Sequence, residues 1–141
     1  MSAIEGHPKS EQYGGTGGKP FQDDLTEAKE LIAISIRHGS RIDSILGVWK
    51  TEKGEQITGK HHGGYGGNES IVVLQPGEKI NKVIIHYGDS VDYLEFHTSE
   101  GNEFHFGGTG GDEPHAEVSG NILGFFGRSD DELDAIGFFL E

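Results

Sequence analysis

Apolar and polar residues alternate along most of the chain beyond residue 30, and this period of two predicts β-strands. The segment 31–37 is rich in β-branched residues, with Ile34 and Ile36 alternating in its second half. Strands are predicted over residues 31–37, 42–49, 71–74, 79–87, 91–97, 103–106, 121–126 and 133–140. Residues 23–30 have an acidic start but no amphipathic repeat, so a loop is expected there. Short strands without long helices predict an all-β sandwich, barrel or prism.

The strand predicted over residues 42–49 divides its side chains between two faces. One face is expected to carry Ile42, Ser44, Leu46 and Val48, and the other Asp43, Ile45, Gly47 and Trp49. Trp49 is expected to pack in the interior. Phe125-Phe126 and Phe138-Phe139 are adjacent pairs, so one residue of each pair is expected in the core and the other on the outer face, where it could meet a neighbouring subunit.

Two kinds of loop recur along the chain with one shared period. Glycine loops of the form Gly-Gly-x-Gly-Gly begin at residues 14, 63 and 107, which are 49 and 44 residues apart. Loops that end in aspartate close at Asp43, Asp92 and Asp134, which are 49 and 42 residues apart. A period of this length indicates three copies of one supersecondary unit. Each copy reads as glycine loop, strand, strand, aspartate loop and strand, and three similar sheets are expected to meet in one core.

Composition narrows the class of protein further. The 141 residues suit a single domain, and the 24 glycines are accompanied by only 4 prolines, as in a turn-rich globular protein. The formal net charge of −13 makes nucleic acid an unfavourable partner and disfavours an anionic membrane surface. There is no cysteine, which excludes disulfides, thiolate metal sites and cysteine nucleophiles.

Residues 1–12 are polar and contain no alternation, so they are expected to form a flexible N-terminal extension. They also lack the apolar run of a signal peptide, and no stretch approaches the roughly 20 apolar residues of a membrane span. A cytoplasmic protein without membrane insertion is therefore expected, although the mature form of a secreted protein would look similar.

Three separated motifs then suggest a family. They are His62-Gly63-Gly64-Tyr65-Gly66-Gly67, the stretch from Gly39 to Asp43, and Gly124-Phe125-Phe126-Gly127-Arg128-Ser129 followed by Leu133-Asp134-Ala135-Ile136-Gly137. Together they resemble the jacalin-related lectins of the mannose-binding type, and the resemblance covers residues 13–141 as one jacalin-like lectin domain. It implies a β-prism I fold of three four-stranded Greek-key sheets with pseudo-threefold symmetry, which binds sugar at one end and has no catalytic activity.

The resemblance implies three carbohydrate sites, each made of a glycine loop and an aspartate loop. The first combines Gly18 with Asp131, Glu132 and Asp134; the second combines Gly67 with Ser40, Arg41 and Asp43; the third combines Gly111 with Asp89, Ser90 and Asp92. The first site departs from the family pattern, because Asp130 stands where the family has glycine. If that position needs a positive φ, the side chain is unfavourable there, and the added negative charge does not help to bind a neutral sugar.

These residue types suit a sugar on chemical grounds. An ionised carboxylate accepts hydrogen bonds from two adjacent hydroxyls, backbone N–H groups donate to the hydroxyl oxygens, and glycine leaves room for close approach. The resemblance favours mannose or glucose, because galactose-preferring members expose a glycine amino terminus, whereas residues 1–13 precede the first glycine loop here. The expected partners are glycans or glycoproteins that contain these sugars, bound multivalently by a homo-oligomer, most simply a dimer.

Other chemistries find less support in the sequence. His86, His97, His105 and His115 show no recognisable ligand spacing and the acids at 130–134 do not match a Ca²⁺ loop, so neither a metal nor a cofactor is expected. A glycosidase needs two carboxylates about 5 to 10 Å apart across a cleft, and nothing in the sequence pairs two of them. The alternative to a lectin is a structural or protein-interaction β-prism with vestigial sugar sites.

Overall fold

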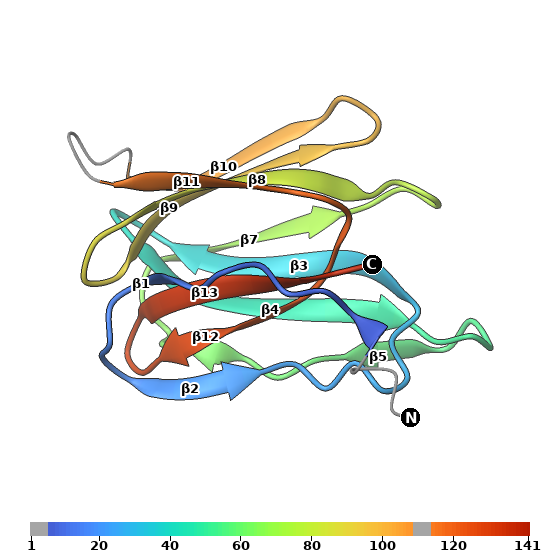
Figure 1. Ribbon diagram of the computed structural model, residues 1–141, viewed down its shortest axis with the longest axis horizontal. Helices are drawn as coiled ribbons and strands as arrows, with labels where there is room; N and C mark the ends of the chain where they lie inside the picture. The colour runs from blue at the N-terminus through green and yellow to red at the C-terminus, as the bar shows by residue number, and fades with distance from the viewer. Residues whose placement is uncertain (1–5, 109–113) are drawn as a thin grey trace.

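The computed structural model describes residues 6–108 and 114–141, which form three antiparallel sheets (Figure 1). The first sheet has the order β1-β13-β12-β2, with strands Tyr13–Gly14, Leu133–Leu140, Ile122–Ser129 and Lys19–Gln22. The second has the order β5-β4-β3-β7, with strands Gln56–Thr58, Ile42–Lys50, Glu30–His38 and Asn68–Val73, and β6 (His62–Gly63) also pairs with β4. The third has the order β10-β9-β8-β11, with strands Glu103–Gly107, Val91–Thr98, Ile80–Tyr87 and His115–Ser119.

Each sheet combines strands from two copies of the sequence repeat. A long hairpin forms its centre: β12–β13 in the first sheet, β3–β4 in the second and β8–β9 in the third. The strand that follows a glycine loop then pairs with the hairpin of the preceding copy, as β7 does with β3 and β11 does with β8. By the same rule β2, near the start of the chain, pairs with β12 near its end. The expected all-β prism of three similar sheets is confirmed. The pairing of β2 with β12 places the two ends of the chain in one sheet.

The apolar faces of the three sheets meet in a single core. Side chains from all three sheets are fully buried there, among them Ile34, Ile45, Phe96, Phe125 and Phe138. Trp49 is also interior, as expected, and its indole Nε1 donates a hydrogen bond of 2.6 Å to the carbonyl oxygen of Leu123 in the first sheet. The long strands predicted from the sequence are present, and residues 23–29 are a loop.

The two faces predicted for β4 are wrong at its start. In the ladder of β3 and β4, Arg37 pairs with Ser44 and His38 pairs with Ile42, so Asp43 has no opposite residue. This β-bulge shifts the alternation by one residue. As a result Ile42 is buried like Ile45 and Trp49, and does not share the half-exposed face of Leu46 and Val48.

The phenylalanine pairs differ from one another. Phe125 is buried and Phe126 is only partly buried, as expected, but Phe138 and Phe139 are both buried. The expectation of one outward ring is therefore wrong for the second pair. Phe139 lies 5.3 Å from the ring of Phe126, measured between centroids, and is covered by the segment that precedes β1.

That covering segment lies within the residues expected to be flexible. Ser10 donates its backbone N–H to the carbonyl oxygen of Phe138 at 2.9 Å, and Leu140 donates to that of Pro8 at 2.9 Å. The ammonium of Lys9 lies 4.9 Å from the centre of the Phe126 ring and 5.5 Å from that of Phe139. Residues 8–10 thus pack along β13 and extend the first sheet, which differs from a free extension over residues 1–12.

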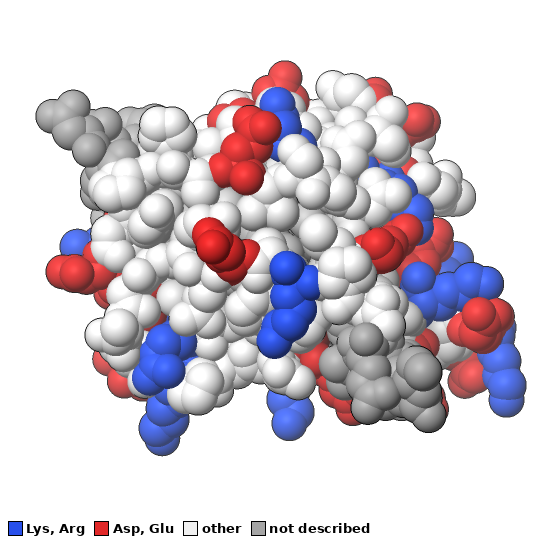
Figure 2. Space-filling model, in the orientation of Figure 1, with Lys and Arg blue, Asp and Glu red and all other residues white. Residues whose placement is uncertain are grey.

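The surface is charged without a continuous basic area on the face drawn in Figure 2, where Lys and Arg side chains are separated by acidic and neutral ones. Within the two described ranges, no helix has the length and apolar character that crossing a membrane requires.

Candidate functional site

The turns of the three central hairpins lie at the same end of the prism, at the left of Figure 1. In each turn the first residue donates its N–H to the carbonyl oxygen of the third at 3.0 Å: Gly39 to Arg41, Gly88 to Ser90, and Asp130 to Glu132. Neither the two glycines nor Asp130 has a positive φ. The expectation that this position could require glycine is therefore wrong, and Asp130 supports the same turn as its two counterparts.

Each turn is followed by a bulge at the aspartate that the sequence singled out. The pattern at Asp43 recurs in the third sheet, where His86 pairs with Tyr93 and Tyr87 pairs with Val91, so that Asp92 is passed over. It recurs again in the first sheet around Asp134, between partners Ala135 and Leu133. Bulges commonly redirect a side chain next to a functional site. Here they place three carboxylates at equivalent positions.

The redirected carboxylates lie against the glycine loops. A Cβ built on Gly18 would lie 2.5 Å from Oδ2 of Asp134, and one built on Gly67 would lie 2.7 Å from Oδ2 of Asp43. Both glycines have left-handed backbones, with φ of +69° and +68°, so a side chain would be strained as well as blocked. The structure therefore brings together Gly18 with Asp134 and Gly67 with Asp43, as the sequence predicts for the first and second sites.

The structure describes the aspartate loop of the third site and only the first two residues of its glycine loop. Gly111 lies outside the described residues, but the start of its loop is visible at Gly107, whose φ is +92°. The next residue, Gly108, donates its N–H to the carbonyl oxygens of Asp92 and Ser40, at 3.0 Å each. In the other copies Gly15 and Gly64 donate in the same way, at 2.9 Å, to the carbonyl oxygens of Asp134 and Asp43.

The glycine loops have an anchor that the sequence reasoning missed. Arg37 donates to the carbonyl oxygens of Gly66 and Gly67 at 3.0 and 2.9 Å. Arg128 donates in the same way to the carbonyl oxygens of Gly17 and Gly18, at 2.9 and 2.8 Å. The signal was present in the sequence, because each arginine precedes its site aspartate by six residues; the third copy has His86 at this position.

The first and second sites open into one shallow depression of about 260 Å³. Its lining residues are Gly18, Asp43, Asp130, Asp131, Glu132 and Asp134. Burial raises the pKa of the Asp134 carboxyl, and the negative charges of Glu132, Asp130 and Asp131 raise it further, against the opposing charge of Arg128. Oδ2 of Asp134 is buried and accepts no hydrogen bond from the described part of the chain.

Arg41 lies beside carboxylates of the other two copies. Its guanidinium lies 3.5 Å from Oδ1 of Asp92 and 3.3 Å from Oε2 of Glu132, so it links the aspartate loops of the other two copies. The backbones of Asp89 and Asp131 pack against Gly15 and Gly64 of neighbouring copies. The three predicted sites therefore share their walls and form one continuous end of the prism.

The remaining predicted contact residues differ in what they can offer. Ser90 is buried and exposes little surface, whereas Ser40 is exposed and its carbonyl oxygen accepts a hydrogen bond from the N–H of Gly108. Tyr65, in the second glycine loop, is 77% exposed and stacks on His61 with 4.2 Å between ring centroids. It gives the second site an exposed aromatic ring that the sequence reasoning did not single out.

A sequence profile of the jacalin-like lectin domain matches residues 10–139. The chain belongs to the jacalin-like lectin family. It is 33% identical to jacalin-related lectin 3 of Arabidopsis thaliana in an alignment 148 positions long, which covers 97% of this chain and 24% of that protein. It is 29% identical to horcolin of Hordeum vulgare over 91% of this chain and 92% of horcolin. A mannose/glucose-specific lectin of Parkia pendula is 27% identical over 98% of this chain and 33% of its own length.

Solved structures agree with the architecture. Wild-type Malaysian banana lectin superposes with a TM-score of 0.84 and 28% identity, over 96% of this chain and 99% of that one. A mannose-binding jacalin-related lectin from Ananas comosus superposes with a TM-score of 0.85 and 26% identity, over 95% and 96% of the two chains. Lengths among the curated relatives vary: this chain spans most of horcolin but only about a quarter of jacalin-related lectin 3.

Proposed function

We propose that this chain is a non-catalytic lectin that binds mannose- or glucose-type glycans at the end of the prism formed by the aspartate bulges. The observation that carries the proposal is the triple recurrence of a bulged aspartate beside a glycine loop. Two of these aspartates, Asp43 and Asp134, lie directly against glycines whose Cβ would collide with the carboxylate.

The chemistry of the pair matches a hexose. A carboxylate oxygen accepts a charge-assisted hydrogen bond from each of two neighbouring ring hydroxyls, which fixes the orientation of the sugar. The wall opposite Asp134 is backbone at Gly17 and Gly18, so the ring can approach main-chain N–H groups closely. The loop itself is held by Arg128, which reduces the ordering cost of binding.

The sugar class rests on relatives. One is a mannose/glucose-specific lectin from Parkia pendula, and a structural neighbour from Ananas comosus is a mannose-binding jacalin-related lectin. Each site is shallow and polar, so a single sugar is expected to bind weakly. Since the first and second sites open into one depression, a branched glycan could engage both, and a homodimer would multiply the effect.

The three sites are expected to differ in strength. Asp43 and Asp134 each lie against a glycine of a glycine loop. Each of these loops is held by hydrogen bonds from an arginine. Asp92 instead shares its Oδ1 with Arg41, which competes with a sugar hydroxyl for the same oxygen. We rank the third site below the other two.

A glycan array tests the proposal. The full chain is expected to bind oligomannose and glucose-terminated glycans, and the double variant Asp43→Ala/Asp134→Ala is expected to lose most of that signal. Binding of wild-type protein to none of the glycans at high concentration would contradict the proposal and favour a protein-interaction prism with vestigial sites. A chromogenic glycoside assay on the same sample checks the absence of catalysis.

A further inference from the structure

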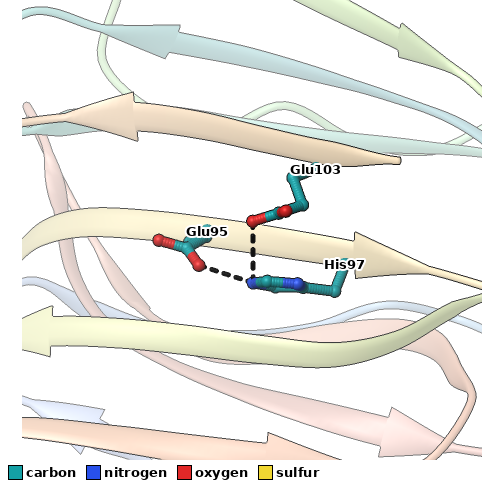
Figure 3. A group of neighbouring side chains, drawn as sticks. All are labelled: Glu95, His97 and Glu103. Carbon is teal, nitrogen blue, oxygen red and sulfur yellow. Dashed lines mark hydrogen bonds and ion pairs between the residues drawn. The ribbon is translucent and has the colours of Figure 1, made fainter. Parts of the chain in front are cut away.

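Two glutamates and one histidine converge on the outer face of the third sheet, away from the core. Glu95 and His97 are two residues apart on β9 and therefore point to the same side of the sheet. Glu103 on β10 lies directly opposite His97 in the antiparallel register. Figure 3 shows the three side chains turned toward one another above the two strands.

The donor atoms are close enough to share an ion. Nε2 of His97 lies 2.5 Å from Oε2 of Glu95 and 3.6 Å from Oε1 of Glu103, and the three atoms lie within 4.8 Å of one another. Zinc bonds of about 2.0–2.2 Å in tetrahedral geometry separate ligand atoms by about 3.4 Å. The distance from Nε2 of His97 to Oε1 of Glu103, 3.6 Å, is already close to this separation. The distance from Nε2 of His97 to Oε2 of Glu95 reaches it if the 2.5 Å contact lengthens by about 1 Å.

A supporting residue fixes the central carboxylate. Tyr93 is buried, with 7% of the residue exposed. Its hydroxyl donates a hydrogen bond to Oε1 of Glu95 at 2.5 Å and also contacts Nδ1 of His105 at 2.7 Å. This leaves Oε2 of Glu95 directed at His97. A hydrogen bond to the second oxygen of a ligating carboxylate is a regular feature of metal sites.

We propose that Glu95, His97 and Glu103 form a binding site for one Zn²⁺ ion. One imidazole and two carboxylates make a mixed nitrogen and oxygen set that suits zinc, whereas Ca²⁺ and Mg²⁺ prefer oxygen ligands alone. Two glutamates balance the charge of the ion, and the chain's net charge of −13 attracts cations in general. Three protein ligands leave the fourth position open to water.

The zinc site is separate from the sugar sites. His97 follows Asp92 on β9 by five residues, which corresponds to roughly 17 Å along a strand. Its expected effect is to tie β10, at the edge of the third sheet, to its neighbour β9. The sequence alone did not predict this site, because its three ligands come from two strands and acquire their spacing only through the register of the sheet.

Calorimetric titration of ZnCl₂ into the full chain, freed of metal with a chelator, tests the proposal. We expect saturable binding of one Zn²⁺ per chain and a higher Tm with Zn²⁺ than with an equal concentration of Mg²⁺. His97→Ala and Glu103→Gln are each expected to weaken binding at least tenfold while keeping mannoside binding, which shows that they are folded.

His115→Ala is the matched control, because His115 lies on β11 of the same sheet and its ring is 5.6 Å from that of His86. It is expected to bind Zn²⁺ within about twofold of wild type. The proposal is overturned if wild-type protein shows no saturable binding, or if His97→Ala and Glu103→Gln bind Zn²⁺ as tightly as wild type does.

Discussion

Arg37 and Arg128 occupy equivalent positions in two sheets, and each donates a pair of hydrogen bonds to the carbonyl oxygens of a glycine loop. Each loop is therefore fixed at the place where it faces the site aspartate. Charged hydrogen bonds of this kind are worth about 1.5 to 3 kcal/mol each when the partner would otherwise be unpaired. The arginines thus act on binding through the glycine loops and are positioning residues.

Arg128→Ala is expected to lower mannoside affinity at the first site about tenfold, because the carbonyl oxygens of Gly17 and Gly18 lose their common donor. Affinity is best measured in an Asp43→Ala background, where the first site dominates. Lys82→Ala, which removes the positive charge of a half-buried lysine on β8, is the control and should leave affinity unchanged. Equal losses in both variants would show that net charge, and not loop anchoring, determines the effect.

Gly18→Ala and Gly67→Ala are each expected to abolish binding at their own site and to destabilise the fold by about 1 to 3 kcal/mol. The new Cβ would meet a carboxylate oxygen, and the backbone has a left-handed φ. Gly39→Ala is a matched control, since its φ is not positive and no atom lies within 4 Å of its Cβ position. Chemical denaturation should find this control within about 0.5 kcal/mol of wild type.

The raised pKa of Asp134 gives the first site a pH dependence. A protonated carboxyl accepts sugar hydroxyls less well, so binding should decline as pH falls through a pKa above the ordinary aspartate value of about 3.9. Glu132→Gln removes one of the charges that raise this pKa and should move the decline to lower pH. Titrations at several pH values in the Asp43→Ala background measure the midpoint; a midpoint that does not move would contradict this cause.

The raised pKa of Asp134 affects fold stability in the opposite direction: sugar binding weakens as pH falls, whereas the fold weakens as pH rises. A carboxyl with a raised pKa in the folded state binds its proton more tightly there, so ionised Asp134 destabilises the fold at pH values above that pKa. Asp134→Asn should therefore raise Tm at pH 7 while it weakens sugar binding. A lower Tm would indicate that the carboxylate supports the fold.

Glu78 is a stabilising carboxylate far from the sites. Its buried side chain accepts hydrogen bonds from the N–H of Gln75, the hydroxyl of Thr98 and the amide of Asn102, at 2.9, 2.6 and 2.7 Å. The bond from Gln75, followed by those from Thr98 and Asn102, lowers its pKa. Its contribution is present above the unfolded-state pKa of about 4.3 and is lost as pH falls through the lowered folded value.

Glu78→Ala is accordingly expected to cost about 2 to 3 kcal/mol in urea unfolding at neutral pH, because three donors lose their acceptor. The cost should shrink when both proteins are measured in acid. Glu117→Gln, on the exposed side of β11, is the control and should be near neutral. A cost that is the same at neutral and acid pH would contradict the role of the ionised form.

The long strands and the threefold plan could be predicted from the sequence because the strands carry apolar residues at alternate or continuous positions, as residues 33–37 and 133–140 do, and because the repeat is explicit. The short strands β1, β2, β5 and β6 have two to four residues and few apolar positions, so only their partners define them. The bulge at Asp43 also escaped prediction. It depends on the register of β3 against β4, which one strand's sequence does not contain.

The candidate sites show the same division. Gly18 with Asp134 and Gly67 with Asp43 could be paired in advance from the family pattern, and the structure places them in contact. Arg41 is 51 residues from Asp92 and 91 residues from Glu132 along the chain, so the link between them could not be predicted from the sequence. Neither did it show that Asp130 would adopt the turn of its glycine counterparts.

Asp43 and Asp134 are each expected to hold one sugar. Isothermal titration of methyl α-mannoside into wild type, Asp43→Ala, Asp134→Ala and the double variant tests it most directly. We expect each single variant to lose about one binding site per chain and the double variant to retain only the weak heat of the Asp92 site. Heat and stoichiometry in the double variant equal to those of wild type would contradict it.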